Sequence, residues 1–172
     1  MEAQQNIFKE NRERMQDTQD FFEDSSYVLV INVGTLTRFY RRIDAWLILF
    51  YKGLEMPQFN IKEVYELLAT KYSGIFTVAA INCAEEEEIC QEFKVTETPL
   101  IQGYRSDKPD GIPYEGENKT LGDLAMFTVG LMDDFVSVVT DQNYSDFTKK
   151  NVQKIKILLF TNKSTTPPLL KA

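Results

Sequence analysis

The sequence predicts an α/β domain whose central mixed sheet is flanked by helices. Short apolar runs without polar alternation recur along the chain, as from Trp46 to Tyr51, and such runs are typical of strands buried on both faces. Segments with apolar residues at helical spacing follow most of these runs. The predicted order is βαβαβαββα, and the last two strands form a hairpin.

Each element has its own signal. Apolar and β-branched residues predict strands, which we place at residues 27–33, 46–51, 75–81, 100–104 and 112–115. The last strand contains Pro113, which has no N–H to donate, so we expect it at an edge of the sheet. Apolar residues three and four positions apart predict helices, which we place at residues 35–42, 60–69, within 85–93 and at 121–139.

The turn after the 46–51 strand is the expected place for chemistry. Gly53 and Pro57 break the apolar run before the next helix begins. In α/β units, ligands and reacting groups lie at the carboxyl ends of the strands. This turn offers one carboxylate, Glu55, and no nucleophile.

The chain divides into three predicted segments. We expect residues 1–26 to form a polar leader with a loose helix at residues 6–22, and residues 27–140 to form the main domain. Residues 141–172 contain an apolar run at 155–160, which cannot bury both faces alone. We expect this run either to extend the sheet or to begin an incomplete second domain.

Composition excludes several classes of function. The net charge is −7 and the basic residues form no cluster, which argues against a nucleic-acid partner. No apolar run is long enough for a membrane-spanning helix. There is no histidine, and two cysteines are too few for a zinc site, so no metal or cofactor is expected. The acidic run Glu85–Glu88 fits a solvated first helical turn better than a calcium loop.

Three features in order carry a family resemblance. These are the strand 46–51, the strand and cysteine at 78–83, and the stretch 89–100, which contains Thr98-Pro99. Together they resemble thioredoxin-like domains of the protein disulfide isomerase family. The resemblance implies a thioredoxin-like fold, with Pro99 at the family's cis-proline position. Residues 141–170 resemble the opening of the next domain in multidomain isomerases and in thioredoxin-bearing J-domain proteins of the endoplasmic reticulum.

The sequence departs from the family where its redox cysteines lie. Glu55 and Gln58 occupy the two cysteine positions, and Leu49 replaces a buried acid of the preceding strand. Thiol exchange requires a thiolate, which neither residue provides. We therefore expect a redox-inactive domain that is not an enzyme.

Cys83 and Cys90 leave three alternatives open. They form a structural disulfide, as in some domains of the family, or they are two free buried thiols, or they are a reactive pair whose spacing exceeds the usual Cys-x-x-Cys. A disulfide would indicate an oxidising compartment, here the lumen of the endoplasmic reticulum, whereas free thiols would favour the cytosol.

The expected function is protein binding. We expect a binding or scaffolding module of a protein-folding factor, with chaperone-like contacts to unfolded polypeptide or a role in spacing other domains. The expected binding surface consists of Leu54, Glu55, Met56, Pro57, Thr98 and Pro99. The alternatives are a structural subunit, which would bury this surface against a neighbour, and an enzyme that works through Cys83 and Cys90.

Overall fold

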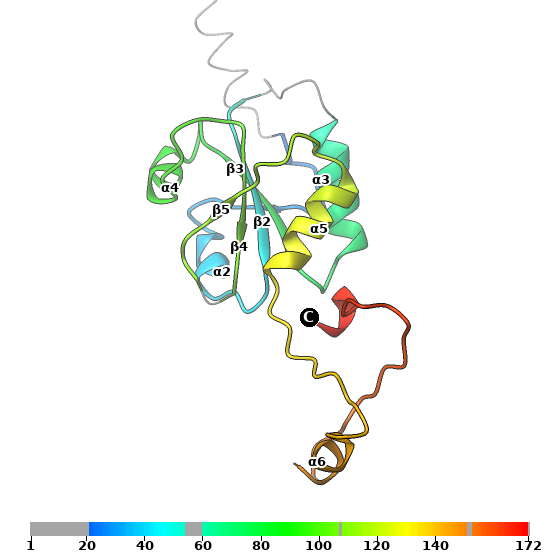
Figure 1. The fold of residues 1–172 in the computed structure, drawn as a ribbon. Coiled ribbons are helices and arrows are strands. Elements are labelled where there is room, and N and C mark those ends of the chain that lie inside the picture. Colours follow the sequence, from blue (N-terminus) through cyan, green and yellow to red (C-terminus); the bar gives the residue numbers. More distant parts are fainter. Residues whose placement is uncertain (1–20, 54–59, 107, 151–152, 172) are drawn as a thin grey trace, which may run out of the picture. The chain divides into compact units, whose positions relative to one another are not determined.

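The computed structural model describes residues 21–53, 60–106, 108–150 and 153–171 (Figure 1). It forms two compact units, the first ending at Met132 and the second spanning Asp133–Lys171. Most of the predicted leader lies outside the described residues. Its last part, at Phe22, is fully buried against Tyr51 and Tyr65, so this ring packs as part of the core.

The first unit is built on a five-stranded mixed sheet, which confirms the predicted fold class. The spatial order is β1-β3-β2-β4-β5. The strands are β1 (Leu29–Val30), β2 (Trp46–Tyr51), β3 (Thr77–Asn82), β4 (Leu100–Tyr104) and β5 (Ile112–Pro113). The central strand β2 is parallel to β3 and antiparallel to β4. The strand that contains Pro113 lies at an edge and pairs with β4 alone, as predicted.

Four helices cover the two faces of this sheet. They are α2 (Leu36–Tyr40), α3 (Ile61–Lys71), α4 (Glu87–Glu92) and α5 (Leu121–Leu131). Figure 1 shows α3 and α5 on one face and α2 and α4 on the other. The buried residues divide in the same way, into one core under α3 and α5 and a second core under α2 and α4.

Strand β2 contributes to both cores. Leu47, Leu49 and Tyr51 lie in the core under α3 and α5, and the alternate residues lie in the other. All six residues are buried. This explains why the run lacks polar alternation, because a central strand covered on both faces has no side chain in water.

Helix α5 is shorter than predicted. It ends at Leu131, and Met132 adopts an extended conformation with ψ 141°. Phe135 and Val138 fall within the helix predicted at residues 121–139, but they lie beyond its end and are 85% and 80% exposed. Asp134 Oδ1 accepts a hydrogen bond from the Val136 amide at 3.1 Å. This local side-chain bond competes with continuation of a helix.

The second unit contains helix α6 (Tyr144–Lys149) and the 3₁₀ helix η1 (Pro168–Leu170). Lys171 forms an ion pair with Asp134 at 3.4 Å. Residues 155–160, predicted as a strand, belong to no ladder among the described residues. Ile155 and Phe160 are 94% and 90% exposed.

Candidate functional site

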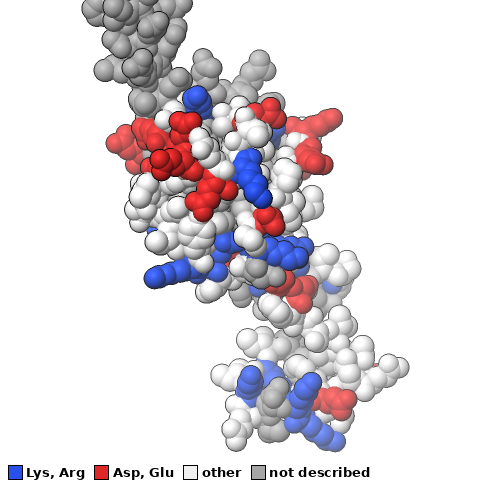
Figure 2. All heavy atoms as spheres, turned by 90° about the vertical axis from the view of Figure 1, so that its left-hand side faces the viewer, with Lys and Arg blue, Asp and Glu red and all other residues white. Residues whose placement is uncertain are grey.

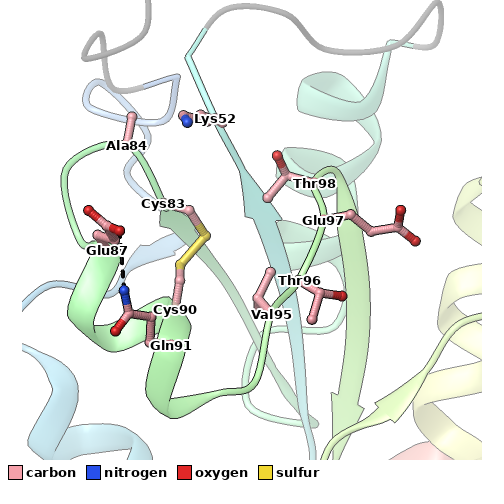
Figure 3. Close-up of a pocket in the computed structure, with 10 residues that line it drawn as sticks. All are labelled: Lys52, Cys83, Ala84, Glu87, Cys90, Gln91, Val95, Thr96, Glu97 and Thr98. Atoms are coloured by element: carbon pink, nitrogen blue, oxygen red, sulfur yellow. Dashed lines mark hydrogen bonds between the residues drawn. A yellow bond between two sulfur atoms is a disulfide. The ribbon is translucent and has the colours of Figure 1, made fainter.

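A groove opens where the parallel strands β2 and β3 end. Its volume is about 580 Å³, and it lies between α4 and the loop that leads into β4 (Figure 3). Its lining residues are Lys52, Cys83, Ala84, Glu87, Cys90, Gln91, Val95, Thr96, Glu97 and Thr98. Lys52 directly follows β2 and Cys83 directly follows β3, so the groove lies at the carboxyl ends of these strands.

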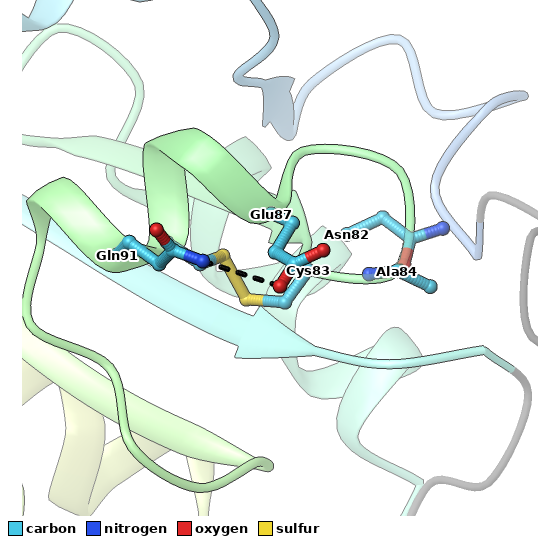
Figure 4. Close-up of a disulfide and its surroundings, with 6 residues drawn as sticks. Asn82, Cys83, Ala84, Glu87 and Gln91 are labelled. Carbon is cyan, nitrogen blue, oxygen red and sulfur yellow. Dashed lines mark hydrogen bonds between the residues drawn. A yellow bond between two sulfur atoms is a disulfide. The ribbon is translucent and has the colours of Figure 1, made fainter.

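One wall of the groove carries a disulfide. Cys83 and Cys90 are joined, with their Cα atoms 5.7 Å apart, so the end of β3 is tied to α4 (Figure 4). Cys83 is half-buried, whereas Cys90 is only 5% exposed. The Cys83 amide donates to the Tyr51 carbonyl at 2.8 Å, which fixes the start of this wall on β2.

The turn between β3 and α4 is held by Asn82. Its Oδ1 atom accepts from the Ala84 amide at 3.1 Å, and its carbonyl accepts from the Glu86 amide at 2.8 Å. These bonds bring the chain from β3 directly into the helix that carries Cys90. On that helix, Gln91 Nε2 donates to Glu87 Oε1 at 3.2 Å beside the disulfide (Figure 4).

The opposite wall is the loop from Val95 to Pro99. Lys94, with φ 58°, turns the chain out of α4, and the Val95 amide donates to the Cys90 carbonyl at 3.0 Å. The Thr98–Pro99 peptide bond is cis. Within the part of the chain that the structure describes, the backbone amides of residues 96–98 donate to no partner. This wall therefore offers three free N–H groups.

Acidic side chains gather over α4 (Figure 2). The run Glu85–Glu88 leads into the helix, and Glu87 and Glu88 lie in its first turn. The Tyr40 hydroxyl donates to Glu92 at the other end. Partial burial, together with the bond to Glu92 and its negative charge, raises the pKa of Tyr40 to about 12. Tyr40 therefore remains a neutral donor at physiological pH.

The described residues show neither a metal cluster nor a membrane span. No three His, Cys, Asp or Glu side chains in the described ranges converge as metal ligands would. No helix in that part of the chain is long and apolar enough to cross a bilayer.

The predicted site residues divide into two groups. Leu54, Glu55, Met56, Pro57 and Gln58 lie outside the described residues. Thr98 lines the groove across from the disulfide, and Pro99 is the next residue in the chain. Sequence reasoning missed Lys52, Glu87, Gln91, Thr96 and Glu97, although most of them are close in sequence to a cysteine or to Pro99.

The fold and the groove define a thioredoxin-like domain. Comparison with known protein families identifies the family to which the chain belongs. The thioredoxin family model matches residues 38–127, which is more than half of the chain. The protein therefore belongs to the thioredoxin family.

Two curated proteins of similar sequence relate this chain to a narrower group within the thioredoxin family. A putative protein disulfide-isomerase of Dictyostelium discoideum is 25% identical over 167 residues, which cover 92% of this chain and 40% of that protein. A protein disulfide-isomerase of Arthroderma benhamiae is 28% identical over 155 residues, covering 86% of this chain and 29% of that protein. The chain thus spans less than half the length of either relative and is related to protein disulfide-isomerases.

Solved structures show the same fold at lower identity. The crystal structure of ERdj5 form II matches with a TM-score of 0.61 and 19% identity, over 75% of this chain and 18% of that chain. The first thioredoxin domain of mouse protein disulfide-isomerase A4 matches with a TM-score of 0.50 and 18% identity, over 72% and 91%.

The prediction that this chain is not an enzyme is contradicted by these findings. Its curated relatives are disulfide-isomerases, and the chain does carry a cysteine pair that forms a disulfide. The prediction rested on Glu55 and Gln58, the positions after β2 where the family keeps its cysteines. It failed because it considered only these two positions, whereas the fold joins a different pair, Cys83 after β3 and Cys90 on α4.

Proposed function

We propose that this chain is a polypeptide-binding domain of a protein-folding factor that exchanges disulfides with its client through Cys83 and Cys90. One observation carries the proposal: the disulfide and residues 96–98, whose backbone amides donate to no described partner, line the same groove. A client bound to those amides would hold its own cysteines beside the disulfide.

Binding would use the backbone of the client. Free N–H groups on an exposed loop pair with the carbonyls of an extended peptide, as in other cases of strand addition. The volume of about 580 Å³ is in the range of established ligand sites. Because backbone groups provide the contacts, many sequences would bind, which suits a folding factor.

Exchange would begin at Cys83, because its sulfur belongs to the more exposed cysteine. A client thiolate attacks Cys83 Sγ, forms a mixed disulfide and releases Cys90 as a thiolate. A second client thiolate then attacks the client sulfur of the mixed disulfide. The products are an oxidised client and two reduced cysteines in this chain. The Lys52 ammonium, which lines the groove, would stabilise the thiolates by its charge.

The proposed compartment is the lumen of the endoplasmic reticulum. Disulfides persist in oxidising compartments and are rare in the cytosol. The Cys83–Cys90 disulfide and the relation to disulfide-isomerases both support this location.

We further propose that residues 141–172 begin a second thioredoxin-like unit. Leu49, Phe50 and Pro57 recur as Leu159, Phe160 and Pro167 at the same spacing. The match to the Dictyostelium relative covers 92% of the chain and so extends into the second unit. Thioredoxin-bearing J-domain proteins also have such an architecture. In it, this domain would hold neighbouring domains of the same protein at a distance from each other.

Mixing the oxidised chain with a reduced two-cysteine peptide tests the proposal. We expect one peptide disulfide to form for each Cys83–Cys90 disulfide lost, as measured by alkylation and mass spectrometry. Cys90→Ser should accumulate a mixed disulfide at Cys83 when it is offered a peptide disulfide, whereas Cys83→Ser should trap less. Peptide oxidation at the rate of a buffer control would overturn the exchange step.

Binding is measured separately with a peptide that has no cysteine. This peptide should shift the amide NMR resonances of Thr96, Glu97 and Thr98 in the wild type. The same shifts should appear in the Cys83→Ala/Cys90→Ala variant. Resonances that stay unchanged at saturating peptide would overturn the binding surface.

A further inference from the structure

The sequence Asn-x-Ser/Thr, with x other than proline, occurs three times in this chain. The three asparagines are Asn118, Asn143 and Asn162. This tripeptide is the acceptor sequence for N-linked glycans in proteins of the secretory pathway, where acceptors lie in surface loops. The structure distinguishes the three by their hydrogen bonds.

Asn118 lies in the exposed connection between β5 and α5. Its side-chain amide bonds to no residue that the structure describes. The surrounding backbone is held in place, because the Tyr114 hydroxyl donates to the Asn118 carbonyl and Thr120 Oγ1 accepts from the Asp123 amide as the N-cap of α5. The acceptor nitrogen is therefore free while its backbone is fixed.

Asn162 offers a similar acceptor in the second unit. It is exposed, it lies outside helices and strands, and its side chain makes no hydrogen bond to the described part of the chain. The turn around Asn162 is held by its neighbours instead, because the Lys163 amide donates to Thr161 Oγ1 at 3.1 Å.

Asn143 differs because both ends of its amide are engaged. Its Oδ1 atom accepts from the Thr140 amide at 2.8 Å, and its Nδ2 atom donates to the Val138 carbonyl at 2.9 Å. A sugar on Nδ2 would replace one N–H and crowd the contact with Val138. These bonds hold the segment that leads into α6, so a glycan here conflicts with the fold.

We propose that Asn118 and Asn162 are N-glycosylation sites and that Asn143 is not. The inference rests on the lumenal location in the proposed function. The donor is a lipid-linked oligosaccharide diphosphate. The anomeric carbon forms a bond to Asn Nδ2, its bond to the diphosphate oxygen breaks, the lipid diphosphate leaves, and one amide proton is lost.

A glycan at Asn118 is compatible with the proposed binding site. The residues that line the groove come from 52, 83–91 and 95–98, and none belongs to the connection between β5 and α5. Glycosylation at Asn118 would therefore leave the disulfide and the free amides accessible to a client.

Translating the full chain behind a secretion signal, in the presence of endoplasmic reticulum microsomes, tests the sites. We expect two gel-mobility steps that an N-glycan endoglycosidase removes. Asn118→Gln and Asn162→Gln should each lose one step, and Asn143→Gln should lose none. Thr120→Ser, which preserves both the acceptor sequence and the helix cap, should retain its step.

Two results would overturn the inference: a wild-type chain whose mobility the endoglycosidase does not change, or the loss of a step in Asn143→Gln. Both are independent of the peptide-exchange assay, which uses unglycosylated protein from bacteria. Endoglycosidase treatment of the protein from its own cells then tests the location itself, because a mobility shift there requires passage through the lumen.

Discussion

At the scale of single residues, Gly103 sets how closely α5 can approach the sheet. A Cβ atom at this position would lie 2.2 Å from Leu131 Cδ1 and 2.7 Å from Phe127 Cε1. Both side chains pack against the core on this face of the sheet, and Leu131 is only 7% exposed. A side chain here would have to displace the ends of both residues, so glycine permits the close contact between β4 and α5. The pattern of apolar residues does not reveal this.

Gly103→Ala is expected to lower the free energy of unfolding by about 1–3 kcal/mol, the usual cost of overpacking a core. Gly130→Ala is the matched control, since a Cβ atom there meets nothing within 4 Å. Gly130 is the penultimate residue of α5, so this change should stabilise by at most about 1 kcal/mol, the Gly-to-Ala difference in a helix interior. Urea unfolding of both variants checks the pair, and shifts of the same sign would contradict the packing argument.

At the scale of elements, α4 depends on its covalent tie to β3. It has only six residues, and isolated helices of that length are unstable in water. Ile89 and Cys90 are its buried residues, and the disulfide adds a fixed point next to them. The sequence predicted a short helix here because apolar positions and a charged first turn are local signals.

Cys83→Ala/Cys90→Ala is expected to destabilise the first unit by about 2–3 kcal/mol, the chain-entropy value for a loop of this length. Helix α4 should lose local stability in addition, because the sheet keeps its own core whereas the short helix loses its fixed point. Hydrogen exchange should therefore accelerate most in the α4 amides and least in β2. The reduced wild-type protein is the control and should show the same pattern, whereas equal acceleration throughout the unit would argue against a local role.

At the scale of the whole molecule, buried tyrosines limit stability at alkaline pH. Burial raises the pKa of Tyr65 and of Tyr104 above the ordinary value of about 10. The folded state therefore favours the neutral form more than the unfolded state does. Their contribution to stability is fully present below about pH 10 and is lost as the pH rises through the folded-state pKa values.

The urea midpoint should accordingly fall above about pH 10, together with a delayed rise of tyrosinate absorbance at 295 nm. Tyr65→Phe is the informative variant, because the buried Tyr65 hydroxyl has no hydrogen-bond partner among the described residues. We expect this variant to be as stable as the wild type at neutral pH and to lose less stability at alkaline pH. An unchanged alkaline loss in Tyr65→Phe would show that this hydroxyl is not responsible.

The local pattern of apolar residues and prolines was sufficient to predict most elements of the fold. The six apolar residues from Trp46 to Tyr51 predicted a fully buried central strand, and Pro113 predicted an edge, because burial and the missing N–H act at those positions themselves. Pattern failed beyond Leu131, where apolar residues continue at helical spacing but a side-chain bond at Asp134 competes with the helix.

The sequence by itself determined the α/β order, the central strand and the presence of Cys83, Cys90 and Pro99. Only the tertiary structure decided that the two cysteines and the loop residues 95–98 form opposite walls of one groove. That juxtaposition depends on how β3, α4 and the loop pack in three dimensions. It therefore could not be derived from the turn after β2, where the order of residues along the chain had placed the chemistry.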